Sequence, residues 1–346
     1  RSCKMQEERS ARIQFIDLAK GFCILAVLWY HVRFDMPAST IEYTMRNVRM
    51  PLYFFLSGLF FKTYSGFSEF TLRKVNKLLV PFVFFFLISY MAGVICHFLG
   101  FYEKGIIQDP FEWTIIFEMF WKERYTYNAP IWFFVSLFEV SVGSYFLIEK
   151  LKSNYTNLII AGFLCGSIGF GLNYMGIDLP LHVDTSLRYM PFFMIGYVVK
   201  QRSPLLYPNP YDKYIPLALL ALGTLTYLLA PAEPLDNVLF HYISGLSGIL
   251  FVILLSKKLV QIPVISYIGR YSLVVLGTHT FLVGPLRYVF SRIIPNQEMM
   301  FVATWIAIIA ISMGIIPILI KLFPTFLAQK DLIPVKKQTK IATQPF

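Results

Sequence analysis

Three ionisable side chains occur within one apolar stretch near the start of the chain: Asp17, Lys20 and His31. In a helix each residue turns by about 100°, so Lys20 lies about 300° from Asp17 and His31 lies about 40° short of four full turns from it. All three side chains therefore share one helix face, with a rise of about 21 Å between Asp17 and His31. Because histidine takes up a proton readily near neutral pH, this face could carry an acid–base pair at one end and a general base at the other.

These residues also have purely structural explanations. Asp17 and Lys20 have the i,i+3 spacing of an ion pair near a helix start, and His31 could simply cap a helix at an interface. Ionisable side chains inside membrane segments are costly, however, which makes each of them a functional candidate. Candidates for substrate binding or for stabilising a developing oxyanion are Arg49, Arg188, Arg270 and His279, and Glu139 could pair with Arg188.

A short basic segment, Arg73-Lys74-Val75-Asn76-Lys77, directly precedes an apolar stretch that begins at Leu78. Its cations could anchor a membrane helix on the cytoplasmic side. Alternatively, Lys74 and Lys77 could form an i,i+3 pair that holds phosphate groups at the start of that helix.

The composition defines the class of protein that must position these residues. Of 346 residues, 56% are hydrophobic, 17% are aromatic and only 15% are charged, whereas a typical soluble domain is about 25% charged. This balance argues against a soluble enzyme, a secreted disulfide scaffold and a disordered tail. The net charge of +11 does not indicate nucleic-acid binding, because the basic residues lie between the apolar blocks. No His or Cys spacing resembles a metal site, so we expect no metal.

The apolar blocks are about as long as a bilayer is thick and predict an all-α polytopic membrane protein with about ten transmembrane helices. Their approximate bounds are 13–33, 48–64, 78–100, 130–149, 157–174, 186–200, 214–231, 236–256, 264–286 and 300–324. The first block is too long for a signal peptide and no small-residue cleavage site follows it. Loops on the N-terminal side hold 20 Lys and Arg residues against 8 on the other side, so both termini are expected in the cytoplasm. We expect a membrane domain over 1–329 and a short polar cytoplasmic tail over 330–346.

The opening of the chain, from Arg12 to Gly21 and on to Trp29-Tyr30-His31, resembles the start of the acyltransferase-3 family of integral membrane acyltransferases. That family begins with an Asp, a basic residue three positions on and a His fourteen positions after the Asp. Three later segments are similar to further family motifs, in the same order: Pro51 to Gly58, Ala129 to Phe134, and Ile268 to Ser272 followed by Thr278-His279.

The resemblance implies transfer of an acyl group, usually acetyl, from acyl-CoA to a hydroxyl of a cell-surface carbohydrate, polysaccharide or glycolipid at the bacterial cytoplasmic membrane. It makes His31 the catalytic base, with Asp17 and Lys20 in support. The family's paired arginines correspond most nearly to Lys74 and Lys77 as contacts for the CoA phosphates, and Arg73 could share that role. Lysine offers a point charge where arginine offers a planar fork, so the donor site departs from the family pattern.

Two alternatives stay open from the sequence. The acyl group could be succinyl or another group in place of acetyl, and the acceptor glycan is not identified. From another class, a transporter or flippase for a glycan or lipid would also suit ten spans with polar intramembrane residues. No pair of Gly- or Pro-broken segments is repeated between the two halves, as many transporters would show.

Overall fold

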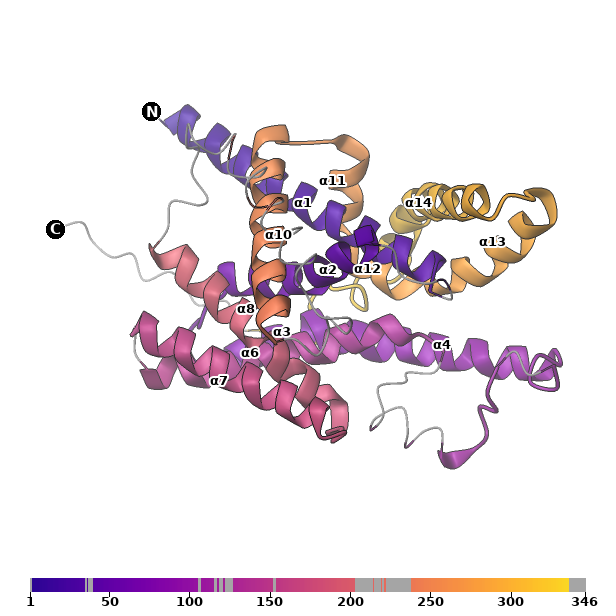
Figure 1. The fold of residues 1–346 in the computed structure, drawn as a ribbon, viewed down its shortest axis with the longest axis horizontal. Coiled ribbons are helices and arrows are strands. Elements are labelled where there is room, and N and C mark those ends of the chain that lie inside the picture. The colour runs from indigo at the N-terminus through magenta and orange to yellow at the C-terminus, as the bar shows by residue number, and fades with distance from the viewer. Residues whose placement is uncertain are drawn as a thin grey trace.

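The computed structural model describes residues 2–34, 36, 40–104, 107–114, 117, 121, 127–151, 154–202, 214, 219, 221 and 238–335. Every regular element in these ranges is a helix, which confirms the all-α prediction (Figure 1). The first part of the chain forms α1 (Ser2–Val32), α2 (Thr40–Leu59), α3 (Phe67–Lys74), the π-helical turn η1 (Val75–Leu79), α4 (Val80–Phe98), the 3-10 turn η2 (Ala129–Ile131), α6 (Trp132–Leu151) and α7 (Tyr155–Tyr174). The second part forms the 3-10 turn η3 (Pro180–His182), α8 (Val183–Arg202), α10 (Val238–Leu259), α11 (Pro263–Arg270), α12 (Ser272–Thr278), α13 (Thr280–Ile293) and α14 (Gln297–Leu322).

Six helical segments within the described ranges are long and apolar enough to cross a bilayer, and the bent pair α12–α13 would make a seventh. The apolar part of α2, Val48–Leu59, is shorter than a full span. The predicted span 214–231 lies almost wholly outside the described residues. The chain is therefore a helical membrane protein, while ten spans and cytoplasmic termini stay predictions.

The structure corrects three boundaries. The single span predicted over 264–286 is broken: α11 ends at Arg270, Tyr271 leaves helical geometry with φ −104° and ψ 25°, and the axes of α12 and α13 differ by 58°. The predicted loop before Leu78 is helical from Phe67 onward, because η1 joins α3 to α4 without an interruption. The predicted loop 287–299 is mostly helical, since α13 runs to Ile293.

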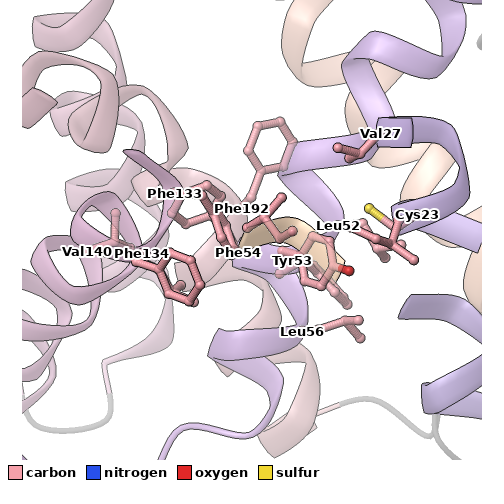
Figure 2. Close-up of a cluster of buried hydrophobic side chains, with 14 of the residues drawn as sticks. Cys23, Val27, Leu52, Tyr53, Phe54, Leu56, Phe133, Phe134, Val140 and Phe192 are labelled. Atoms are coloured by element: carbon pink, nitrogen blue, oxygen red, sulfur yellow. The ribbon is translucent and has the colours of Figure 1, made fainter. Parts of the chain in front are cut away.

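Helices α1, α2, α6 and α8 surround a core rich in aromatic side chains (Figure 2). Phe54 of α2 stacks on Tyr189 of α8 with ring centroids 4.5 Å apart. Glycines make the α2–α8 contact close: a Cβ on Gly58 would overlap the carbonyl of Phe193, and one on Gly196 would overlap the carbonyl of Phe55. Small residues at helix crossings let two backbones touch, the usual way of packing helices where the solvent is lipid. This core fixes α2 against α1, where the candidate residues lie.

Candidate functional site

Asp17 and Arg270 form an ion pair between α1 and α11, with Arg270 Nε 3.2 Å from Asp17 Oδ2. The carboxylate is nearly buried, whereas the Arg270 side chain is 59% exposed. A backbone contact one residue earlier sets this pair: a Cβ on Gly269 would overlap the Asp17 carbonyl and the backbone of Gly21. Glycine at both positions therefore brings the two helices together and places the guanidinium beside the carboxylate.

Lys20 lies within electrostatic reach of two charges, those of Asp17 and Lys77. Its backbone carbonyl accepts a hydrogen bond from the Tyr53 hydroxyl at 3.3 Å. Figure 2 shows that hydroxyl directed from α2 toward Cys23 on α1, and Ser272 of α12 is within its hydrogen-bonding reach. The structure thus brings Lys20 together with Lys77, which the sequence separated into two candidate sites.

The basic segment is a continuous helical turn, and its three cations differ in their surroundings. Arg73 binds Glu69 through two contacts, with Nη2 2.7 Å and Nε 2.8 Å from Oε1, and its guanidinium lies 4.7 Å from the centre of the Tyr64 ring. Lys74 Nζ lies 5.6 Å from the centre of the Phe70 ring. Lys77 is exposed and close enough to Lys74 for the two charges to interact. Lys74 and Lys77 are therefore the cations of this segment best placed to receive an anion.

Asn76, between the two lysines, is a residue that the sequence analysis did not select. Its side chain is buried and makes three hydrogen bonds to the chain after α14: Nδ2 donates to the Ile333 carbonyl at 2.8 Å, and Oδ1 accepts from the amides of Leu332 and Ile333 at 3.0 and 2.9 Å. The start of the predicted polar tail is thus fixed against η1, and the turn that carries Lys74 and Lys77 is held in place.

At the other end of α1, His31 packs against His279, with ring centroids 4.9 Å apart and planes tilted by 56°. His279 is fully buried at the bend between α12 and α13, and its Nδ1 lies 3.0 Å from the Val275 carbonyl oxygen. A carbonyl only accepts, so Nδ1 carries the proton and the free lone pair of the neutral ring is on Nε2. Among the described residues, Nε2 is buried without a hydrogen-bond partner.

The bend that holds His279 is fixed by Asn128, another residue that the sequence analysis missed. This buried amide donates to the Gly277 carbonyl at 2.9 Å and to Ser89 Oγ at 3.0 Å, and it accepts from Thr280 Oγ1 at 3.0 Å. It therefore ties both sides of the bend to α4. Its only sequence signal was its place directly before the Ala129-Pro130 segment.

His31 also lines a pocket of about 540 Å³ whose other walls are Phe34, Thr280, Val283, Gly284 and Arg287. One wall is the end of α1 and the other is one face of α13. His31 is thus the side chain that faces both the buried His279 and an opening large enough for part of a substrate.

The two remaining candidates lie in different surroundings. Arg49 is buried with its guanidinium 4.2 Å from the centre of the Tyr30 ring, its carbonyl accepts from the Cys23 thiol, and its charge acts on His31. Arg188 donates to Thr185 at 2.8 Å and lies over Phe170 of α7.

Glu139 accepts from Ser186 at 2.6 Å, so the structure gives Glu139 and Arg188 neighbouring partners on α8. Arg188 thus belongs to the α6–α7–α8 group, whereas Arg49 belongs with His31. Within the described residues no group of three His, Cys, Asp or Glu side chains is arranged to hold a metal.

Comparison with known proteins adds one finding to this geometry. The family model of acyltransferase-3, which is described as an acyltransferase domain, matches residues 13–321. Neither the curated proteins nor the solved structures gave a match. The matched range contains every candidate residue above and nearly all of the helical chain. The chain therefore belongs to the acyltransferase-3 family and is a membrane acyltransferase.

Proposed function

We propose that this protein transfers an acyl group, most simply acetyl, from acyl-CoA to a hydroxyl of a cell-surface carbohydrate or glycolipid, with His31 as the general base. The observation that supports this role most directly is that His31 both packs against buried His279 and lines the 540 Å³ pocket. A base must reach the proton it removes, and the pocket is where an acceptor hydroxyl would meet the imidazole.

In this proposal the donor binds at the opposite end of α1. Lys74 and Lys77 contact its phosphates, and Lys20 and Arg270 extend the same positive surface around Asp17. Lysine and arginine are the usual protein partners of phosphate groups. Arg73 has a smaller part in donor binding, because Glu69 already occupies its guanidinium. The donor supplies an activated thioester carbonyl, which the pantetheine arm would carry along the α1 face toward His31.

His31 removes the proton from the acceptor hydroxyl as the oxygen attacks the thioester carbonyl. The C–O bond forms, the C–S bond breaks, and the protonated imidazole returns its proton to the departing thiolate. Asp17 and Lys20 are positioning residues, about 21 Å and about 16 Å along α1 from this step. They hold α11 and the donor segment against α1.

The sequence made His279 a candidate for stabilising the oxyanion, but its hydrogen bonding favours a different role. With Nδ1 committed to Val275, a neutral ring offers only an acceptor at Nε2 and cannot donate to an oxyanion. We assign His279 the role of orienting His31 and stabilising the imidazolium that His31 becomes. Arg49, whose charge also acts on His31, is the better-placed donor for the developing negative charge.

The test is acyl transfer from acetyl-CoA by the purified protein, with a panel of soluble and lipid-linked glycans. His31→Ala should lower the turnover by a factor of about 100 to 10,000, the usual contribution of a general base. His97→Ala is the matched control, because His97 lies at the end of α4 beside Asp109 and Phe111. Full activity in His31→Ala would overturn the assignment. Absence of acyl-CoA binding by the wild type would contradict acyl-CoA as the donor.

A further inference from the structure

The chain that follows α14 packs beside the candidate donor segment, and residues 323–335 are here called the strap. We propose that the strap is part of the donor site and that Asn76, which holds it, is a positioning residue for acyl-CoA. Asn76 acts through Lys74 and Lys77, the two cations that flank it. The inference deepens the proposed function, because it assumes that these lysines contact the phosphates of the donor.

Aromatic contacts fix the first half of the strap on α4. Phe326 stacks on Phe84 with ring centroids 5.3 Å apart, and the ring of Phe323 lies 5.2 Å from that of Phe84. The carbonyl of Pro324 accepts from the amide of Gln329 at 2.9 Å, which closes a turn within the strap. The strap therefore reaches η1 from a fixed base.

The second half of the strap is held by Asn76. Its Oδ1 uses both lone pairs on the amides of Leu332 and Ile333, and its Nδ2 donates to the Ile333 carbonyl. The side chains of Leu332 and Ile333 are 50% and 36% exposed, so apolar burial contributes little to holding this part of the chain. Loss of the Asn76 side chain would therefore release it.

The turn that carries the two lysines is less well fixed by its own backbone than an α-helix is. In η1 the amide of Val80 donates to the Val75 carbonyl, the wide hydrogen bond of a π turn, which is rare and often lies at functional sites. Pro81 has no N–H, so position 81 gives the turn no further hydrogen bond. The extra residue of a π turn rotates the residues before it by about 100° relative to those after it. The directions of both lysines depend on this turn, and Asn76 anchors it.

Two like charges on one turn repel each other, so other contacts have to fix their arrangement. Lys77 lies within electrostatic reach of both Lys74 and Lys20. With Asn76 bound to the strap, a donor that carries several phosphates meets cations already in place and loses less freedom on binding. Release of the turn would let Lys74 and Lys77 separate. Donor affinity would then fall, whereas the chemistry at His31, at the other end of α1, would be unaffected.

Two variants break the contact from opposite sides. Asn76→Ala removes the side chain, and Leu332→Pro removes one of the amides that Oδ1 accepts from. Because Leu332 is exposed, Leu332→Pro keeps the test valid where Asn76→Ala lowers the melting temperature. Gln329→Ala is the matched control, since this side chain bonds to the Leu327 carbonyl within the strap itself.

Three measurements on the full chain in detergent are needed: calorimetric titration with acetyl-CoA, kcat at saturating donor, and hydrogen–deuterium exchange of the Ile333 amide. Asn76→Ala and Leu332→Pro should each bind acetyl-CoA about tenfold more weakly, exchange faster at Ile333 and keep kcat within about twofold of the wild type. Because both break one contact, the double variant should bind no more weakly than the weaker single variant. Gln329→Ala should bind as the wild type does. Wild-type affinity in both single variants, unchanged exchange in Asn76→Ala, or an equal loss of affinity in Gln329→Ala would overturn the proposal.

Replacing both Lys74 and Lys77 by alanine separates this inference from the proposed function. That variant should lose acetyl-CoA binding, and normal binding by it would contradict the proposed donor site together with the role of the strap. Lost binding in that variant, with wild-type binding in Asn76→Ala and Leu332→Pro, would leave the donor site standing and overturn the role of the strap alone. The two failures are therefore distinguishable.

Discussion

His31 and His279 come from opposite ends of the chain and pack ring against ring, 4.9 Å between centroids, because α1 ends where the bend between α12 and α13 begins. The two rings differ in their surroundings. His279 is fixed by Val275 and fully buried, while His31 borders the pocket. In the proposed mechanism the ring that borders the pocket, His31, is the base, and the fully buried ring, His279, supports it.

His279→Gln tests that division of roles. The glutamine keeps a polar side chain of similar reach but cannot reproduce both ring nitrogens, so His31 would lose its oriented partner. We expect the turnover number for acyl transfer to fall by about 100-fold while the KM for acetyl-CoA changes little. Steady-state kinetics at varied donor concentration separate the two. A large rise in the donor KM with an unchanged turnover number would show that His279 acts in donor binding.

Gly269→Ala tests the contact that places Arg270 beside Asp17. The added Cβ would overlap the Asp17 carbonyl and the Gly21 backbone, so α11 must move away from α1. Overpacking of this kind costs about 1–3 kcal/mol, and the melting temperature in detergent should fall together with donor affinity. Gly314→Ala is the control on α14, where a Cβ would meet nothing within 4 Å. Equal melting temperatures for the two variants would argue against the close crossing.

Asn128→Ala should loosen the bend. It leaves the Gly277 carbonyl without its donor and Thr280 without its acceptor in a buried setting, which costs about 1–3 kcal/mol. Thermal unfolding and turnover should both decline, because His279 is held by the same bend. Asn157→Ala, at an exposed position on α7, is the control and should behave as the wild type. Lost stability with full turnover would separate Asn128 from the site.

If Lys74 and Lys77 bind the phosphates of the donor, acetyl-CoA binding should depend on their positive charges. Replacing both Lys74 and Lys77 by alanine should abolish detectable acetyl-CoA binding, and the binding of the wild type should weaken as salt screens the charges. Another basic pair, Lys257 and Lys258 at the end of α10, provides the control: its alanine variant should bind the donor normally. Calorimetric titration of the detergent-solubilised protein measures the donor affinity of the wild type at each salt concentration and of the two variants. Unchanged affinity in the Lys74 and Lys77 variant would place the donor elsewhere.

The helical class could be predicted from the sequence because it depends on a local pattern, the apolar blocks. The same kind of pattern placed Asp17, Lys20 and His31 on one helix, as α1 confirms.

The sequence could not predict the break within 264–286. Apart from Arg270 and His279 that stretch is largely apolar and indicates one span. The bend depends on Asn128, which reaches it from a distant segment.

The same reason explains the other omissions. Asn76 stands out only through its hydrogen bonds to the backbone of Leu332 and Ile333. Arg287 stands out only because it lines the same pocket as His31. A single polar residue beside an apolar block marks an unusual position in the sequence, but the residues that it contacts are set by tertiary packing. The pairing of Asp17 with Arg270 instead of Lys20 has the same origin in the Gly21–Gly269 contact.

The central claim is that His31 is the base of an acyl transfer reaction. Its most direct test is the rate of acetyl transfer from acetyl-CoA to a responsive glycan by purified wild type, His31→Ala and His97→Ala, each shown by thermal unfolding to be folded. We predict that His31→Ala binds acetyl-CoA with unchanged affinity but loses at least about 100-fold in turnover, while His97→Ala retains activity. Wild-type turnover in folded His31→Ala would contradict the account.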